Sequence, residues 1–258
     1  MRGIVNLANT CHFSSALQCL LHIPKLTDHV ASLDYDGTCG FTRAYIEFVR
    51  GGDGSGSYDP TTLFRELQKQ FPRISEFDEN DLQETVLLVI DILEKEIPEL
   101  KKWFYGVRVQ ETVYPGGTST MEDAFGACIL PMMESGNLLD MLERAGKWNA
   151  LTDFVDDDGK THNVATTRSL IRDLPKFPMF TFDRKGIVNA PTALKARERK
   201  FTLVAAGLHL GTQSGGHYVT LGRSRTGDWY LFDDEHVRKV DFETKAPYSL
   251  LVYAEDET

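Results

Sequence analysis

The amino-acid sequence predicts an α+β fold in which helices come first and strands come last. Apolar residues recur at helical spacing through much of residues 11–97, whereas β signals dominate from Leu151 onward. The two kinds of segment do not alternate, which favours α+β over alternating α/β. With 258 residues, of which 41% are hydrophobic and 26% charged, the chain is long enough for one large domain.

The helices of the first part are indicated by apolar positions three and four residues apart. Phe13, Leu17 and Leu20 recur at this spacing, and Pro24 is expected to mark the end of that helix. Residues 51–57 form a flexible Gly/Ser-rich loop by composition. Further helices are predicted at 41–49, at 60–70 and along the stripe of Leu82, Val86, Ile90, Leu93 and Ile97.

The second part is assigned mostly to strands. The predicted elements are strand at 103–113, a short helix or irregular segment at 119–133, a helix at 138–145, and strands at 177–182 and 201–210. Two further strand-like runs, 217–222 and 229–232, flank a turn that contains Gly227. This order predicts a β-rich second half.

Composition excludes several classes of protein. The formal net charge of −10 makes nucleic acid a poor partner, because phosphate binding needs clustered Lys and Arg. An acidic surface attracts basic partners, although plain solubility explains the charge equally well. No apolar run approaches the roughly 20 residues of a membrane helix. The four cysteines contain no C-x-x-C pair, so neither a structural zinc site nor a disulfide framework is expected, and a cytoplasmic or nuclear compartment fits.

Cys11 lies where an Asn/Thr-rich turn meets the start of the first predicted helix. The positive end of the helix dipole and the unpaired backbone N–H groups there favour the thiolate form. A lone free cysteine is more often simply buried. The position alone therefore leaves a structural thiol as the alternative to a nucleophile.

His217 lies in a predicted hairpin, directly after Gly215 and Gly216. If the hairpin closes around Arg225 and Thr226, counting residues places His217 opposite Asp233 or Asp234. A carboxylate that orients an imidazole is the arrangement that a thiol nucleophile needs. The two glycines leave room for a narrow substrate to approach closely. A single histidine is more often an ordinary surface or core residue, but this neighbourhood favours a catalytic one.

Four stretches of the chain resemble the ubiquitin-specific proteases, the papain-like class of deubiquitinases. Residues 3–20 follow that family's Cys box, approximately G-L-x-N-L-G-N-T-C-[YF]-[ML]-N-S-x-L-Q-C-L, and residues 216–237 follow its His box, approximately G-H-Y-x-x-[YL]…W-[YF]-x-F-D-D-x-x-V. Weaker matches are residues 79–84, similar to a Q-Q-D-x-x-E-F helix start, and residues 174–182, similar to an L-P-x-x-L-x-[IL]-x-L-x-R-F strand. The four stretches span nearly the whole chain in family order.

The resemblance implies a papain-like cysteine protease fold in one catalytic domain, residues 1–258. It divides the chain into a helical thumb at 1–106, shortened fingers at 107–165 and a β-rich palm at 166–258. Members of the family often bind zinc in the fingers through two C-x-x-C pairs. Cys128 is the only cysteine in the fingers segment here, so no zinc and no other cofactor are expected.

The implied activity is cleavage of the (iso)peptide bond after the C-terminal Gly-Gly of ubiquitin. Cys11 would attack the carbonyl, and His217 would deprotonate the thiol and then protonate the leaving amine. Asp233, with Asp234 as the nearby alternative, would orient His217. Asn6 would donate its side-chain amide to the oxyanion, beside the backbone N–H of Cys11.

The resemblance also implies a channel for the ubiquitin tail. Asp81 and Glu84 would face arginines of that tail, although acids in a first helical turn also offset the helix dipole. A blocking loop at 209–216 would cover this channel, and Gly215 and Gly216 of the loop would line it. His209, which also matches the family pattern, would have a positioning role. The expected partners are ubiquitin and ubiquitinated proteins, without nucleic acid or membrane, and the chain is expected to be monomeric.

The sequence departs from the family pattern around the site. The departures put tail binding in question rather than the chemistry, and they are Ala8 for Gly, His12 for an aromatic residue, Ser14 for Asn, Glu79-Asn80 for Gln-Gln and Thr85 for Phe. Because the chain begins almost at the Cys box, an excised domain or a minimal enzyme is expected.

Two alternative functions stay open beside a deubiquitinase. A catalytically impaired ubiquitin-binding scaffold would not need Asn6, Cys11, His217 and Asp233 together, so their joint presence argues against it. A protease for a ubiquitin-like modifier would keep the same chemistry, and the departures around Asp81 are compatible with it.

Overall fold

The computed structural model describes residues 1–51, 56–212 and 215–256. Its helices are α1 (Cys11–Leu21), α2 (Pro24–Ser32), α3 (Gly40–Arg50), α4 (Thr61–Gln70), α5 (Leu82–Glu96), α6 (Glu99–Phe104) and α7 (Leu138–Ala145). Its longer strands are β1 (Gly106–Tyr114), β2 (Gly117–Phe125), β7 (Ala165–Asp173), β11 (Arg199–Thr212), β12 (Gly215–Arg223), β13 (Trp229–Asp233), β14 (His236–Val240) and β16 (Tyr248–Glu255). The shorter strands are β3 (Cys128–Leu130), β4 (Asn149–Leu151), β5 (Phe154–Val155), β6 (Thr161–His162), β8 (Met179–Phe182), β9 (Val188–Asn189), β10 (Ala193–Ala196) and β15 (Lys245–Ala246).

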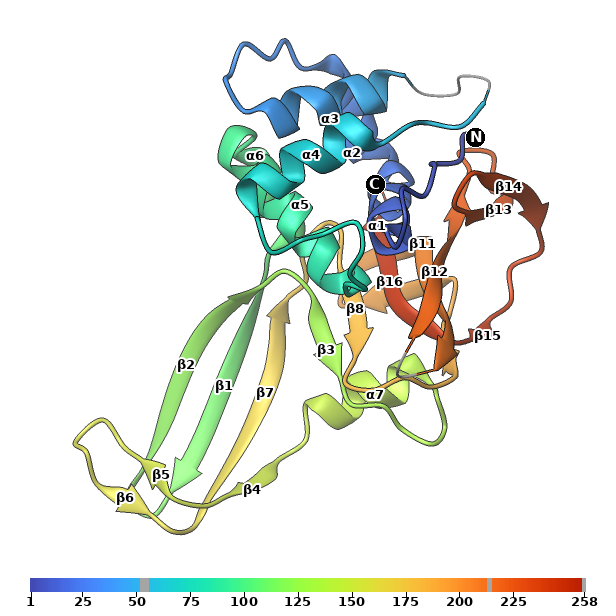
Figure 1. Ribbon diagram of the computed structural model, residues 1–258. Helices are drawn as coiled ribbons and strands as arrows, with labels where there is room; N and C mark the ends of the chain where they lie inside the picture. The colour runs from blue at the N-terminus through green and yellow to red at the C-terminus, as the bar shows by residue number, and fades with distance from the viewer. Residues whose placement is uncertain (52–55, 213–214, 257–258) are drawn as a thin grey trace.

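Two sheets contain most of the described strands, and two short pairs, β15-β9 and β5-β6, stand apart from them. The larger has the order β14-β13-β12-β11-β16-β8-β3, with β10 paired to β11, and the smaller has the order β2-β1-β7-β4. Figure 1 shows α1–α6 gathered on one side of the larger sheet, while the smaller sheet extends away from both. The sheets do not follow the predicted division between fingers at 107–165 and palm at 166–258. Strand β7 pairs with β1 in the smaller sheet, and β3 pairs with β8 in the larger one.

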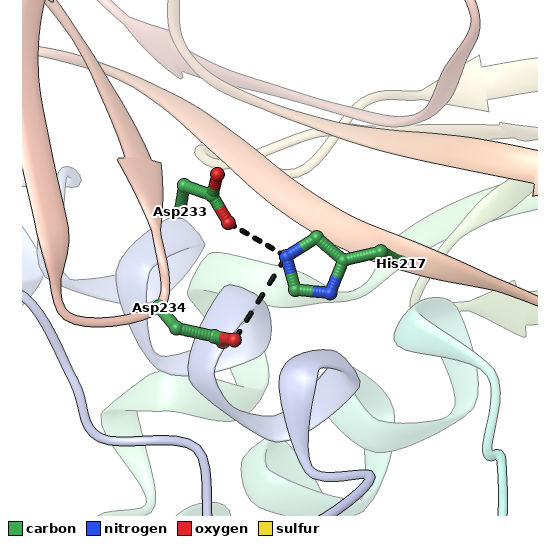
Figure 2. Close-up of side chains that lie close together, drawn as sticks. All are labelled: His217, Asp233 and Asp234. Carbon is green, nitrogen blue, oxygen red and sulfur yellow. Dashed lines mark hydrogen bonds and ion pairs between the residues drawn. The ribbon is translucent and has the colours of Figure 1, made fainter.

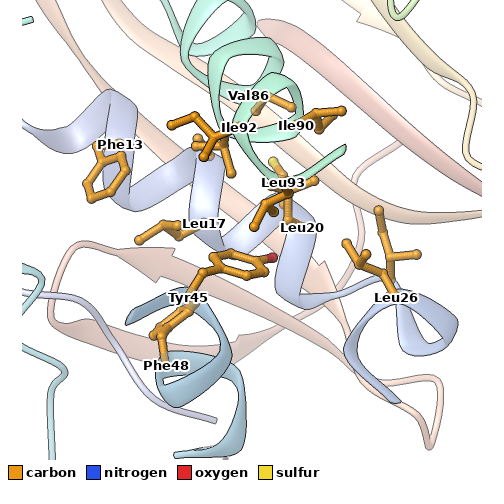
Figure 3. Packing of buried hydrophobic residues seen from close by; sticks show 14 of the residues in the cluster. Phe13, Leu17, Leu20, Leu26, Tyr45, Phe48, Val86, Ile90, Ile92 and Leu93 are labelled. Carbon is orange, nitrogen blue, oxygen red and sulfur yellow. The ribbon is translucent and has the colours of Figure 1, made fainter. Parts of the chain in front are cut away.

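Helix α1 lies at the centre of the helical part. Residues Cys11 to Leu20 are all buried, including its polar residues, because the sheet and α5 pack against it. Leu17 and Leu20 meet apolar residues of α3 and α5, among them Tyr45 and Leu93 (Figure 3). A helix buried on all sides holds its first residue, Cys11, in a close-packed environment.

The larger sheet has a core on each face. Along β16, Leu250 and Val252 belong to the cluster with α1 and α5, whereas Leu251 and Tyr253 belong to the cluster on the α7 side. This alternation follows from the two-residue period of a strand. The sheet that carries His217 is therefore supported from both sides.

The smaller sheet is stabilised differently. Strand β2 is mostly exposed, and cross-strand ion pairs join Arg108 to Asp123, Arg168 to Glu111 and Arg172 to Glu122. Its tip is held by rings of Tyr114, Phe154 and His162, and His162 Nε2 lies 2.7 Å from Asp156 Oδ2.

Several predicted elements differ from the structure. Pro24 begins α2 instead of marking only an end, since its fixed φ suits a first helical position. Trp103 and Phe104 lie in α6 rather than in a strand, because both rings pack against Phe177. Residues 119–133, expected to be helical or irregular, contain the end of β2 and all of β3, where cross-strand pairing decides the conformation.

No helix in the described ranges is long and apolar enough to cross a membrane.

Candidate active site

Cys11 is the first residue of α1, and its side chain is largely buried, with 9% of the residue exposed. Burial raises the pKa of the thiol above its ordinary value, and the Asp234 carboxylate raises it further. Hydrogen bonds from the backbone N–H groups of Tyr218, His12 and Cys11 oppose this shift without reversing it. The backbone N–H groups at the helix start thus favour thiolate, as expected, but desolvation outweighs them and the net shift of the pKa is upward.

His217 faces two carboxylates at the end of β13. Its Nε2 lies 2.7 Å from Asp233 Oδ1 and 3.8 Å from Asp234 Oδ2, as Figure 2 shows. A neutral ring that donates from Nε2 keeps the Nδ1 lone pair for accepting a proton. Within the described ranges, no hydrogen bond joins His217 to Cys11. The thiol and the base are thus near a common site but not paired at rest.

The hairpin register differs from the predicted one. Thr220 pairs with Phe232 and Arg223 with Trp229, so the hairpin centres on Thr226. Extending that register would place His217 opposite Glu235, whose neighbour Asp234 adopts a left-handed φ of 50° at the next turn. The strand ends at Asp233, and this turn brings the carboxylates back towards His217.

Asn6 connects this hairpin to the turn that precedes Cys11. Its Nδ2 donates to Asp234 Oδ2 at 2.8 Å, and its Oδ1 accepts from the backbone N–H of Thr10 at 3.0 Å and of Ala8 at 3.2 Å. Burial raises the pKa of Asp234, while the hydrogen bond from Asn6 and the nearby His217 oppose the shift. A carboxamide has two N–H donors, so the bond to Asp234 leaves one for another acceptor.

A pocket of about 210 Å³ opens beside Cys11. Its lining residues are Asn9, Cys11, Glu79, Asn80, Asp81, Lys185, His209, Gly216 and Tyr218. A second pocket of about 370 Å³ shares Asp81, Lys185, His209 and Tyr218 with it and also includes Glu84. We call these two adjoining pockets the channel, and Cys11 lies in the smaller of them.

Four of the five predicted tail-binding residues line this channel: Asp81, Glu84, His209 and Gly216. A Cβ at Gly216 would lie 2.3 Å from the ring of His209, so a side chain there would displace the ring. Gly215 lies beside the channel, where a Cβ would be 3.5 Å from Glu79 Oε1.

Asp81 has a structural role as well as a place in the channel. Its Oδ1 accepts from the backbone N–H of Gln83 at 2.8 Å and of Glu84 at 3.2 Å, which makes it the N-cap of α5. Its Oδ2 accepts from the hydroxyl of Tyr218 at 3.2 Å. Tyr218 and Lys185 were not singled out in the sequence. Tyr218 could have been found from its place directly after His217. No feature of the sequence pointed to Lys185.

The segment expected to be a blocking loop continues the sheet. Gly211 pairs with Gly216 and Thr212 with Gly215, while residues 213–214 of this segment lie outside the described ranges. His209 packs edge-on against Tyr218, with ring centroids 4.7 Å apart. Burial and the nearby Lys185 lower the pKa of His209.

Among the described residues, one cluster of three side chains is close enough to share a metal ion, and it consists of His217, Asp233 and Asp234. These are the same groups that form the candidate catalytic arrangement. The four cysteines are free thiols and do not form a cluster of three with other ligand-type side chains in the described ranges.

Known proteins with a similar sequence were found by comparison. The chain is 30% identical over 107 residues to ubiquitin carboxyl-terminal hydrolase 8 of Arabidopsis thaliana, an alignment that covers 37% of this chain and 12% of the relative. It is 22% identical to ubiquitin carboxyl-terminal hydrolase 36 of Drosophila erecta over 92% of this chain and 27% of that relative. The chain thus spans well under half the length of these two relatives.

Among solved structures, the chain resembles the Ubp8-containing SAGA DUB module bound to monoubiquitin. The TM-score is 0.86 at 22% identity, covering 100% of this chain and 69% of the other. This likeness shows a ubiquitin-specific protease fold of α+β, papain-like type. The model of the ubiquitin carboxyl-terminal hydrolase family matches residues 2–179 and 160–253. The chain belongs to the ubiquitin carboxyl-terminal hydrolase family.

Proposed function

We propose that the chain is a thiol deubiquitinase that hydrolyses the (iso)peptide bond after the C-terminal Gly-Gly of ubiquitin. The observation that carries the proposal is the channel at Cys11, which is lined by Gly216 and Tyr218, the two chain neighbours of His217, whose ring pairs with Asp233. A channel with a glycine in its wall suits an extended tail that ends in two glycines. Family membership and the ubiquitin-bound structural neighbour support the same function.

The mechanism begins with a protonated thiol, because burial raises the pKa of Cys11. His217 Nδ1 takes the thiol proton as sulfur attacks the carbonyl carbon, and Asp233 holds the resulting imidazolium at Nε2. The free N–H of Asn6 and the backbone N–H of Cys11 donate to the oxyanion. His217 then returns the proton to the leaving amine, which leaves a thioester on Cys11.

The second half of the cycle uses the same groups. Water attacks the thioester while His217 accepts its proton, and the tetrahedral intermediate expels the Cys11 sulfur. The sulfur recovers its proton from His217, so the enzyme returns to its starting state. Asp234 supports the cycle by holding Asn6, whose Nδ2 lies 2.8 Å from its carboxylate.

A second candidate substrate is a ubiquitin-like modifier with a less basic tail. The observation that favours it is Lys185, a cation that lines both parts of a channel otherwise carrying Glu79, Asp81 and Glu84. A lysine in this place repels arginines of an incoming tail and partly offsets the acidic residues.

The test is covalent labelling by ubiquitin that carries an electrophile at its C-terminus. We expect one adduct, on Cys11, and no adduct with Cys11→Ala. Cys19→Ala is the matched control, because Cys19 lies in the same helix and burial raises its pKa to about 12, so labelling should persist. A folded protein without an adduct would reject the proposal. Faster labelling by an electrophile built on a ubiquitin-like modifier would favour the second substrate.

A further inference from the structure

Three departures from the family pattern lie in contact with one another. His12, directly after Cys11, is 1% exposed, and its Nδ1 lies 2.7 Å from Oγ1 of Thr85. Its Nε2 lies 3.4 Å from Nδ2 of Asn80. Thr85 lies in the first turns of α5, and Asn80 precedes the N-cap of the same helix. The contacts therefore join the helix of the nucleophile to the start of α5.

The hydrogen bonds assign the protons of this group. The Thr85 hydroxyl has one hydrogen, which it donates to the backbone carbonyl of Asp81 at 2.8 Å. Its oxygen must then accept from His12 Nδ1, so His12 Nε2 is the acceptor for the amide of Asn80. Burial lowers the pKa of His12 to about 4, although Asp81 opposes the shift. The ring is neutral at pH 7, as this pattern requires.

The same contacts set the wall of the channel. Nδ2 of Asn80 donates to His12 and to the backbone carbonyl of Asp78 at 3.1 Å, and its Oδ1 has no hydrogen bond in the described ranges. Asn80 and Asp81 line the pocket that contains Cys11. Tyr218 closes the ring of contacts, because its hydroxyl reaches Asp81 and its backbone N–H reaches the Cys11 sulfur.

We propose that His12 is a positioning residue for the tail channel. It ties α1 to the start of α5 and so holds the Asn80 carboxamide and the Asp81 carboxylate at a set distance from Cys11. An aromatic residue could fill this space but could not bond to both Thr85 and Asn80. The ligand that this wall suits is an extended peptide tail, with backbone N–H groups for Asn80 Oδ1 and a cationic side chain for Asp81. This inference rests on the proposed function.

The experiment removes the hydrogen bond between His12 and Thr85 by substituting each of the two residues in turn. His12→Leu removes both ring nitrogens, Thr85→Val removes the hydroxyl while keeping the shape, and His12→Asn keeps an N–H close to the place of Nδ1. Thr220→Val is the matched control, because the Thr220 hydroxyl is also buried and donates to a carbonyl of α1, at Ser15, and has no hydrogen bond to α5 among the described residues. Melting temperatures identify variants that fail to fold.

Three measurements are made: steady-state kinetics, the rate of Cys11 alkylation and the affinity for ubiquitin. With ubiquitin carrying C-terminal aminomethylcoumarin, His12→Leu and Thr85→Val should raise KM about tenfold with kcat changed less than about threefold. Alkylation of Cys11 by iodoacetamide, which makes none of a peptide tail's contacts with the channel wall, should change less than about twofold. In a Cys11→Ala background, the same two changes should weaken ubiquitin binding about tenfold. His12→Asn should recover most of the KM, and Thr220→Val should leave it unchanged.

Each other result counts against the inference. A folded His12→Leu and a folded Thr85→Val with wild-type KM and Kd would make His12 a packing residue only. A parallel fall in kcat and in the alkylation rate would place its effect at the nucleophile instead of the channel. A wild-type chain that binds ubiquitin but releases no coumarin would reject the proposed function alone, since the Kd still tests His12. A chain that does neither would overturn both.

Discussion

Two regions of the molecule are stabilised by different interactions. One consists of the helices α1–α6 and the larger sheet, and the other is the smaller sheet. Around α1, side chains such as Leu17 are fully buried between helices and sheet. In the smaller sheet, Met121 on β2 is 57% exposed, and ion pairs such as Arg108–Asp123 cross between strands. Buried packing positions groups tightly, whereas exposed ion pairs each contribute little. Close packing of this kind explains why the candidate catalytic groups all lie in the helical part and the larger sheet.

If the chemistry depends only on the helical part and the larger sheet, removing Asp233 should show the largest effect. Without its carboxylate, His217 loses the 2.7 Å bond that selects its tautomer, so Asp233→Ala should lower kcat by about 10²–10⁴-fold. Glu111→Gln, which weakens an ion pair in the smaller sheet, is the matched change and should leave kcat nearly unchanged. Both are measured with ubiquitin–aminomethylcoumarin. Equal losses in the two variants would contradict the division between the regions.

Stability should separate the regions next. Leu17→Ala in the centre of α1 should lower the free energy of unfolding by about 2–5 kcal/mol, because it leaves a cavity in a close-packed core. Met121→Ala on the exposed strand β2 should change it by less than about 0.5 kcal/mol. Urea denaturation of both variants measures the difference. A comparable loss for Met121→Ala would show that the smaller sheet is packed against something in solution.

The titration of Cys11 gives the smallest and most specific effect. Burial raises the pKa of this thiol, whereas at the tip of the smaller sheet the hydrogen bond from His162 lowers the pKa of Asp156. A raised thiol pKa means less thiolate at pH 7, so alkylation of free Cys11 by iodoacetamide should keep rising, about tenfold per pH unit, beyond pH of about 8.5. A plateau already near pH 6 would reveal a preformed Cys11–His217 ion pair and refute the resting geometry.

The difference between the regions also decides what could be predicted. The helical stripes of α1 and α5 and the helix at 138–145 follow from local spacing and agree closely with the structure. Strand β2 could not be recognised, because its mostly polar, exposed sequence forms a strand through pairing with β1. Strand β3 is only three residues long and depends on pairing with the distant β8. Exposed sheets give a weak periodic signal, since packing and cross-strand partners decide them.

The family, the helices α1, α3, α4 and α5 and the identity of the candidate nucleophile and base could all be predicted from the sequence. Motifs and periodicity are local properties, so Cys11, the His217 hairpin and its two carboxylates could be read in order along the chain. Only the folded chain reveals that Asn6 bonds to Asp234, that His12 bonds to Thr85 and that burial raises the pKa of the Cys11 thiol. These facts depend on burial and on contacts between distant segments, which no local spacing encodes.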